Sequence, residues 1–174
     1  MLKLFVPDLY IKDYTKLNLN ILLQHNIKVL VCDIDNTLVP FDQSHPTDEV
    51  IAFIDKIKKS SIIPVLISNN NADRVSLFAQ NLDVVFYPFA QKPLKKTYLK
   101  VIQDYQIKPE EVACMGDQLM TDVFGANRSH CYTILTKPLV KRDIHYTKIN
   151  RVIEKVVFFL LRVFKLFDKG EYDD

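Results

Sequence analysis

The chain has too few cysteines for a fold stabilised by disulfides. It contains three in 174 residues, Cys32, Cys114 and Cys131, which lie far apart and lack the paired spacing of a zinc site. We therefore expect neither a disulfide framework nor a zinc centre, and a reducing cytoplasm fits this usage best. We interpret Cys32 as a small core residue rather than as a catalytic thiol.

An excess charge of one sign and long apolar runs are also lacking. The formal net charge of +2 is too small to indicate a nucleic-acid partner. No segment reaches the roughly 18 uninterrupted apolar residues typical of a membrane-spanning helix, and the first residues do not form a signal peptide. With no repeat, linker or low-complexity tract, we expect residues 1–174 to form a single domain.

Apolar runs alternate with helical patterns along the chain. This alternation predicts a three-layer, Rossmann-like α/β fold with a parallel sheet between two layers of helices. Residues 1–24 are expected to form an arm with a short helix that packs on the sheet. We expect strands over about 28–34, 61–67, 83–86, 112–115 and 132–135, and helices over 48–60, 73–81, 93–105, 119–128 and 148–169.

Two carboxylates, Asp33 and Asp35, follow the first predicted strand directly. Residues i and i+2 of a strand share a face, so both side chains can face the same spot. Neighbouring carboxylates repel each other unless they bind a cation or share a proton. Since Asp and Asn also favour turns, this pair alone is equally compatible with a simple turn, and the residues downstream must decide.

Polar side chains also follow the other predicted strands. Ser68 and Asn69 follow the second strand, and Lys92 follows the short third one. Asp117 follows the fourth, with Asp122 close behind it. Because the carboxyl ends of parallel strands meet at one edge, these motifs should form one site. Acids, a cation and short polar donors in one cleft suit a phosphate ester with Mg²⁺.

Each motif has a simpler explanation when it is taken alone. Ser68 and Asn69 could cap the helix that follows them. Asp117 and Asp122 could be acids of a turn and of a first helical turn. Lys92 could be a solvated lysine, but the start of a helix is electrostatically the wrong end for a cation.

In their order and strand context, the motifs resemble those of the haloacid dehalogenase-like (HAD) phosphohydrolases. They look most like the YqeG group of small phosphatases, which is similar to the mitochondrial phosphatidylglycerophosphate phosphatases. The likeness covers most of residues 5–140. The matching segments are Asp33-x-Asp35-Asn36-Thr37-Leu38, Ser68-Asn69-Asn70, Lys92-Pro93, Gly116-Asp117-Gln118-Leu119-Met120-Thr121-Asp122 and Gly125-Ala126-Asn127-Arg128.

The resemblance implies a mechanism. Asp33 would be the nucleophile that forms an aspartyl-phosphate, and Asp35 would protonate the leaving oxygen and then deprotonate the attacking water. Mg²⁺ would be held by Asp33, by the backbone carbonyl of Asp35 and by Asp117.

The resemblance also implies roles for the other polar residues of the motifs. Thr37, Ser68, Asn69 and Lys92 would bind the phosphate, and Lys92 would also balance the charge of the nucleophile. Asp122 would orient Lys92 or a metal-bound water rather than contact the metal.

The sequence leaves little room for a cap over the site. The gaps from Asp35 to Ser68 and from Ser68 to Lys92 hold the cap domains of this superfamily, and here the predicted helices and strands nearly fill them. We therefore expect no large cap and an open cleft, which suits a substrate presented on a lipid surface, a polymer or a protein. By resemblance, the leading substrate is phosphatidylglycerophosphate. The alternatives are a soluble metabolite, nucleotide or phosphoprotein as substrate, or a non-catalytic binding module.

The helix expected over 148–169 separates cations from apolar residues. This pattern suits a helix lying on an anionic membrane at its inner face, and it suits equally a terminal helix docked on the sheet or a dimer contact. Phe158 and Leu161 fall on the polar side. The cations are Lys148, Arg151, Lys155, Arg162, Lys165 and Lys169, and the opposite side carries Ile149, Val152, Ile153, Val156, Phe159, Leu160, Val163, Phe164 and Phe167.

Overall fold

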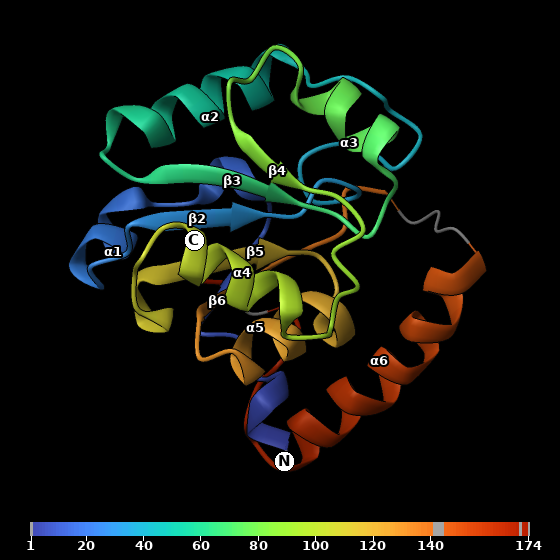
Figure 1. The fold of residues 1–174 in the computed structure, drawn as a ribbon. Helices are drawn as coiled ribbons and strands as arrows, with labels where there is room; N and C mark the ends of the chain where they lie inside the picture. Colours follow the sequence, from blue (N-terminus) through green and yellow to red (C-terminus); the bar gives the residue numbers. More distant parts are fainter. Residues whose placement is uncertain (1, 141–144, 171, 174) are drawn as a thin grey trace.

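The protein is built on one parallel sheet (Figure 1). A computed structural model describes residues 2–140, 145–170, 172 and 173, with the backbone alone for 145–151. The strands pair in the order β1-β6-β5-β2-β3-β4, and all five pairings are parallel. The predicted parallel sheet is thus confirmed. Its strands are β1 (Leu9–Ile11), β2 (Val29–Cys32), β3 (Ile63–Ile67), β4 (Val85–Tyr87), β5 (Val112–Gly116) and β6 (Tyr132–Thr136).

Helices cover both faces of the sheet, which gives the predicted three layers. Leu30 and Cys32 of β2 face one apolar core, whereas Val29 and Val31 face the other, as the two-residue period of a strand requires. Figure 1 shows α2 and α3 above the sheet and α4 and α5 below it. The first core includes α1 (Leu19–Gln24), α2 (Asp48–Lys59) and α3 (Ala72–Ala79), and the second includes α4 (Lys96–Asp104) and α5 (Phe124–Arg128).

No cap domain interrupts the layers between β2 and β4. Residues 33–92 are all described, and they contain α2, β3, α3 and β4 with their connecting loops. Thr47 is the N-cap residue of the helix α2, because its hydroxyl oxygen accepts a hydrogen bond from the amide of Val50 at 3.2 Å. The expectation of a fold without a large cap is confirmed.

The N-terminal segment contains a strand that we did not predict. β1 has three residues between Asp8 and Lys12, too few to show an alternating pattern. The carboxylate of Asp8 accepts a hydrogen bond from the amide of Thr133 in β6 at 2.7 Å, which fixes this end of the pairing. On the outer edge of β1, Tyr10 and Asp173 exchange two hydrogen bonds of 2.7 and 2.8 Å. The end of the chain therefore covers an edge that would otherwise expose unpaired backbone groups.

Several element boundaries differ from the prediction. α4 begins at Lys96 rather than near Pro93, because residues 91–94 form a turn in which the amide of Leu94 donates to the carbonyl of Gln91 at 2.8 Å. β4 begins late because Asp83 has a left-handed backbone, with φ of 47°. The helix predicted over 119–128 consists of a wide π-helical segment, η4 (Leu119–Val123), followed by α5.

The C-terminal helix α6 (His145–Val163) packs beside the sheet, against η4 (Figure 1). It is shorter than predicted, and the chain turns at Lys165, where φ is 53°. Among its described side chains, those of residues 152–163, the buried ones are Glu154, Val157 and Leu161. The helix thus docks through a narrow stripe that includes Leu161, a residue that the helical pattern places on the polar side.

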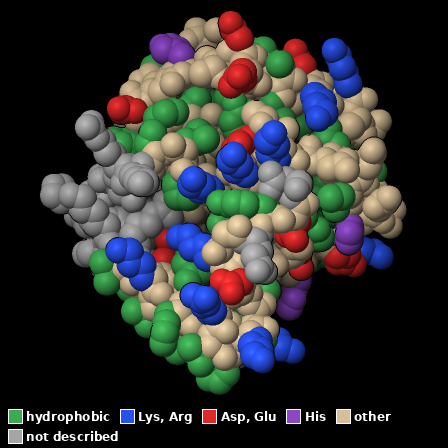
Figure 2. Space-filling view, turned by 180° about the vertical axis from the view of Figure 1, so that it is seen from behind, with side chains coloured by type: hydrophobic (Ala, Val, Ile, Leu, Met, Phe, Trp, Pro, Cys, Tyr) green, Lys and Arg blue, Asp and Glu red, His purple; other side chains and the backbone are tan. Residues whose placement is uncertain are grey.

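The apolar face of α6 points outward instead. Val152, Val156, Phe159 and Val163, which lie on successive turns, expose 63%, 56%, 65% and 56% of their surface. From behind, Figure 2 shows hydrophobic side chains beside lysines and arginines at the lower left, where this helix lies. Among the described residues, no helix has the length and apolar character to cross a membrane. The side chains of Lys148, Ile149 and Arg151 lie outside the described residues.

Candidate active site

Asp33 stands at the carboxyl end of β2, in the middle of the sheet. Its amide donates to the carbonyl of Met115 in β5 at 2.9 Å. The chain then closes a tight turn, in which the amides of residues 37–39 all approach the carbonyl of Ile34 at 2.9 to 3.3 Å. Asn36 has a φ of 64°, a left-handed conformation that asparagine tolerates better than most residues. The acid pair is therefore held in a compact turn beside the switch point between β2 and β5, where parallel sheets bind ligands.

Lys92 forms ion pairs with two buried carboxylates at this end of the sheet. Its Nζ lies 2.6 Å from Oδ1 of Asp33 and 2.6 Å from Oδ1 of Asp122. The Lys92 side chain is 3% exposed, and both carboxylates are buried. The hydroxyl of Thr37 donates to Oδ2 of Asp33 at 3.4 Å, and the amide of Gln118 donates to Oδ2 of Asp122 at 3.0 Å. We call Asp33, Lys92 and Asp122 the buried triad.

Burial and the oppositely charged neighbours act in opposite directions on the pKa values of Asp33 and Lys92. Burial raises the pKa of Asp33 to about 7, although the nearby Lys92 opposes the increase, and the charges of Asp122 and Asp35 add to it. For Lys92, burial would lower the pKa, but the carboxylates of Asp122 and Asp33 outweigh it and raise the pKa above its ordinary value. Lys92 therefore stays charged.

Asp117, at the end of β5, completes a cluster of buried acids. Carboxylate oxygens of Asp33, Asp117 and Asp122 lie within 4.8 Å of one another. Lys92 contacts Asp33 and Asp122, and bringing several buried carboxylates together is costly unless cations accompany them. Oxygen-only ligands in this arrangement suit a hard divalent cation. The chemistry of the donor set therefore fits a metal ion here.

The predicted metal ligands lie at different places in this cluster. Asp33 and Asp117 lie together as expected. Asp122 is equally close, and its two oxygens contact Lys92 and the amide of Gln118; its orienting role stays a prediction. The predicted ligation through the backbone carbonyl of Asp35 is untested by these contacts and stays a prediction.

Asp35 turns to a different set of partners. Its carboxylate is 21% exposed and forms an ion pair with Nη2 of Arg74 at 2.8 Å. It also accepts longer hydrogen bonds from the amide side chain of Asn70 at 3.3 Å and the hydroxyl of Ser68 at 3.5 Å. The sequence analysis missed Arg74 and gave Asn70 no role of its own. Lys92 drew attention because the start of a helix is electrostatically the wrong end for a cation. The same argument could have identified Arg74, which is a cation in the first turn of the helix α3.

The polar residues after β3 organise the site through its backbone. The side chain of Asn69 accepts from the amide of Lys92 at 2.7 Å and donates to the carbonyl of Lys92 at 3.2 Å, so it fixes the position of that lysine. The hydroxyl oxygen of Ser68 accepts from the amide of Asn70 at 3.1 Å. Asn71 caps α3, which removes the simpler explanation that Ser68 and Asn69 are the caps.

Two further residues support the segment from Asp117 to Asp122. Gly116 ends β5 so close to the side chain of Asp122 that a Cβ atom would collide with it. Glu154 of α6 is buried, and its carboxylate accepts a hydrogen bond from the amide of Met120 at 3.4 Å. The sequence analysis did not identify Glu154. The sequence feature that could have indicated it is a single acid among the cations of the helix.

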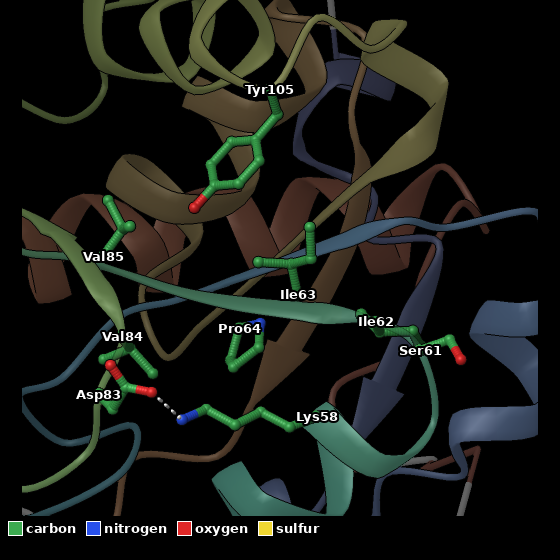
Figure 3. Close-up of a pocket in the computed structure, with 9 residues that line it drawn as sticks. All are labelled: Lys58, Ser61, Ile62, Ile63, Pro64, Asp83, Val84, Val85 and Tyr105. Carbon is green, nitrogen blue, oxygen red and sulfur yellow. Dashed lines mark hydrogen bonds and ion pairs between the residues drawn. The ribbon is translucent and has the colours of Figure 1, made fainter.

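A hollow at the opposite edge of the sheet shows a different character. Lys58, Asp83 and Tyr105 line a space of about 290 Å³ near the starts of β3 and β4 (Figure 3). Lys58 is already engaged there by the carbonyl of Leu82 at 2.8 Å and by Asp83 at 3.5 Å. This hollow contains none of the acids and donors described above. The candidate active site is therefore the one at the carboxyl ends of the strands.

Comparison with known proteins identifies the family of the chain. A family model described as mitochondrial PGP phosphatase matches residues 2–141. The chain is 34% identical over 160 residues to "Probable phosphatase YqeG" of Bacillus subtilis. This match covers 92% of this chain and 93% of that protein.

Solved structures share the fold at much lower identity. The cobalt-bound deoxy-D-mannose-octulosonate 8-phosphate phosphatase of Haemophilus influenzae superposes with a TM-score of 0.52 at 16% identity, over 79% of this chain and 89% of that one. A 3-deoxy-D-manno-octulosonate 8-phosphate phosphatase of Moraxella catarrhalis, solved with magnesium, phosphate and KDO, gives 0.51 at 16% identity, over 83% and 92%.

Proposed function

Because the chain belongs to the mitochondrial PGP phosphatase family and is a HAD phosphatase of the YqeG type, we propose that it hydrolyses phosphatidylglycerophosphate with Mg²⁺ through an aspartyl-phosphate. The buried triad is the observation that carries the mechanism, since Lys92 holds one oxygen of Asp33 at 2.6 Å beside Asp117. A module that only binds phosphate has no need of such an arrangement.

The proposed reaction uses Asp33 and Asp35 in turn. Oδ of Asp33 attacks phosphorus, the bond to the ester oxygen breaks, and that oxygen takes a proton from Asp35. Water then attacks the aspartyl-phosphate and gives a proton back to Asp35, which releases phosphate and regenerates Asp33. Asp35 is the more exposed of the two carboxylates, as a group that exchanges protons with alcohol and water should be.

The remaining polar groups would bind the phosphoryl group. Lys92 is fixed by the Asn69 side chain and offers positive charge beside Asp33. The hydroxyls of Thr37 and Ser68 lie near the two acids and could donate to phosphate oxygens. Asp33, Asp117 and the backbone carbonyl of Asp35 would hold Mg²⁺, which neutralises charge and orients the phosphate when bound. A protein of the same fold has been solved with magnesium and phosphate.

The outward apolar face of α6 supports a lipid-borne substrate. Surface helices of globular proteins normally bury such a face, and here Phe159 and Val163 lie exposed beside the exposed cations Lys155 and Arg162. Apolar side chains flanked by cations suit the surface of an anionic membrane. We therefore propose peripheral binding at the cytoplasmic face of the membrane.

A dimer contact suits the same face less well. An antiparallel two-fold pairing of α6 would place Lys155 and Arg162 of both copies on the same side of the contact, where like charges repel. Arg162 has one acidic partner in the structure, Asp168 at 3.6 Å, in an exposed ion pair that contributes little. The lipid surface therefore explains the cations as well as the apolar residues.

Phosphate release from phosphatidylglycerophosphate in mixed micelles tests the substrate. Soluble phosphate esters are assayed in parallel, and all reactions contain Mg²⁺. The Asp33→Asn variant is the control. Preference for the lipid supports the proposal. Activity on soluble esters alone would keep the chemistry and replace the substrate by a soluble metabolite, nucleotide or phosphoprotein, and silence on all of them would favour a binding module.

Sedimentation with vesicles tests the membrane contact. We expect the full chain to sediment with phosphatidylglycerol vesicles and not with phosphatidylcholine vesicles. Phe159→Asp should abolish sedimentation, whereas Leu99→Asp, a matched change at an exposed residue of α4, should leave it intact. If both variants bind the vesicles equally, the α6 face is not the membrane contact. If the protein is a dimer that Phe159→Asp dissociates, the face is instead a contact with a second copy of the chain.

A further inference from the structure

A second cation, Arg74, reaches Asp35 rather than Asp33. Its side chain comes from the first turn of α3 and is 15% exposed. Nη2 lies 2.8 Å from Oδ1 of Asp35 and 3.4 Å from the carbonyl oxygen of Phe41. Nη1 is buried and has no hydrogen-bond partner in the part of the chain that the structure describes. The guanidinium group therefore retains donors that its present contacts do not use.

The charge of Arg74 is balanced less completely than that of Lys92. Lys92 contacts two carboxylates at 2.6 Å, whereas Arg74 contacts the single carboxylate of Asp35. Buried donors of an arginine without a partner are uncommon in folded proteins. Of these two cations, Arg74 is thus the one whose charge is less completely balanced, and its side chain is 15% exposed.

The proposed reaction places Arg74 next to the alcohol part of the substrate. The leaving oxygen must come within hydrogen-bond distance of Asp35 to take its proton. Since Arg74 contacts the same carboxylate, its guanidinium lies close to whatever that oxygen carries. The phosphoryl group under attack lies instead at Asp33, with Lys92. The two cations therefore face different parts of one substrate.

We propose that Arg74 selects substrates whose alcohol carries a second anionic group, such as a phosphodiester or a carboxylate. A guanidinium attracts such an anion and donates charge-assisted hydrogen bonds to it. Nη1 is buried in this structure, so the side chain would have to turn toward the substrate to use that nitrogen. Phosphatidylglycerophosphate carries a phosphodiester on the glycerol whose monoester is cleaved, and a simple alkyl phosphate carries no second anion. This inference rests on the proposed function and adds a specificity determinant to it.

Two matched soluble substrates separate this role from the chemistry. Both are glycerol phosphate monoesters, and the distal hydroxyl carries a methyl phosphodiester in one and a methyl ether in the other. Steady-state kinetics with Mg²⁺ compare the wild type with Arg74→Gln and Arg74→Lys. Lys56→Gln, which removes an exposed cation of α2, is the control for net charge. Thermal melting verifies that each variant is folded.

We expect the wild type to prefer the phosphodiester substrate, and Arg74→Gln to reduce the ratio of the two kcat/KM values about tenfold or more, mainly through KM. Arg74→Lys should restore part of the preference, and Lys56→Gln should keep it. If Arg74→Gln slows both substrates by one common factor, Arg74 only positions Asp35 and the inference is wrong while the proposed function stands. A folded wild type that hydrolyses phosphatidylglycerophosphate in micelles but neither ester overturns the inference alone, and one that hydrolyses none of the three overturns both.

Discussion

The two carboxylates of the acid pair are two residues apart, yet they belong to different environments. Asp33 is locked in the buried triad, with Lys92 at 2.6 Å and a second acid, Asp122, on the same lysine. The side chain of Asp35 is 21% exposed, against 7% for Asp33, and of its hydrogen bonds to described residues the ion pair with Arg74 is the shortest, at 2.8 Å. One carboxylate is part of the core, and the other is part of the surface.

This difference separates the consequences of changing each group. Removing a member of a buried ion cluster leaves uncompensated charge inside the protein, which affects folding as well as activity. Removing a partly exposed partner lets water take its place, so the effect on folding is small. Changes in the triad should therefore reduce both stability and activity, except where they remove excess charge, and changes at Asp35 and Arg74 should affect activity alone.

The largest expected effect is that of Asp33→Asn on turnover. The amide cannot attack phosphorus, so activity on every ester should fall below a thousandth of the wild-type rate. The fold should persist, because the change removes one buried negative charge and leaves the Lys92–Asp122 pair intact. Phosphate release and circular dichroism measure the two properties. Retention of a tenth of the activity would exclude Asp33 as the nucleophile.

Lys92→Met should have the largest effect on stability. The variant removes the cation that contacts both Asp33 and Asp122, which are buried, so the free energy of unfolding of the metal-free protein should fall by about 3–5 kcal/mol. The matched change Arg74→Met should cost less than about 1 kcal/mol, because Asp35 is accessible to water. Urea unfolding in the presence of a chelator measures both. Equal losses would mean that the two environments do not differ as the structure indicates.

Asp35→Asn should have an effect that depends on the leaving group. An alkoxide needs a proton to leave, so hydrolysis of an alkyl phosphate should slow about a hundredfold or more. A nitrophenolate leaves without protonation, so the first step on p-nitrophenyl phosphate should slow much less. Measuring the burst of nitrophenolate isolates that step. A slow burst equal to the loss on the alkyl ester would argue against an acid role for Asp35.

The sequence predicted the convergence of the buried groups for a physical reason. Parallel strands end at one edge, so acids after β2 and β5 and a lysine after β4 must meet there. Arg74 was missed because it lies inside a helix and shows no strand-end signal, and Asn70 was quoted only as part of the Ser68-Asn69-Asn70 segment, without a role of its own. Their role depends on which way Asp35 turns, and the two-residue period of a strand does not determine that once the strand has ended.

The helices α2 and α6 show the same limit of sequence patterns. Both alternate apolar and charged residues with helical period, and both were predicted as helices. In α2 the apolar residues Phe53 and Ile57 are buried, whereas in α6 the exposed Phe159 faces outward and Leu161 is buried. Periodicity indicates that a face exists, but what covers that face depends on the position of the helix, which is a tertiary property.

The smallest expected effect is the stabilisation of the protein by Mg²⁺, and its pH dependence tests the triad directly. At ten times its dissociation constant, a ligand of the folded state adds about 1.4 kcal/mol. Because burial raises the pKa of Asp33 to about 7, that carboxyl holds a proton at pH 5 that must leave before the cation binds. A pKa raised on folding favours the folded state only at low pH, and this contribution is lost as the pH rises through about 7. Mg²⁺ should therefore raise the melting temperature clearly at pH 8 and little at pH 5, and Asp117→Asn should reduce the shift at pH 8. An equal shift at both pH values would show that the cation binds without competing for the proton of Asp33, and would place it elsewhere.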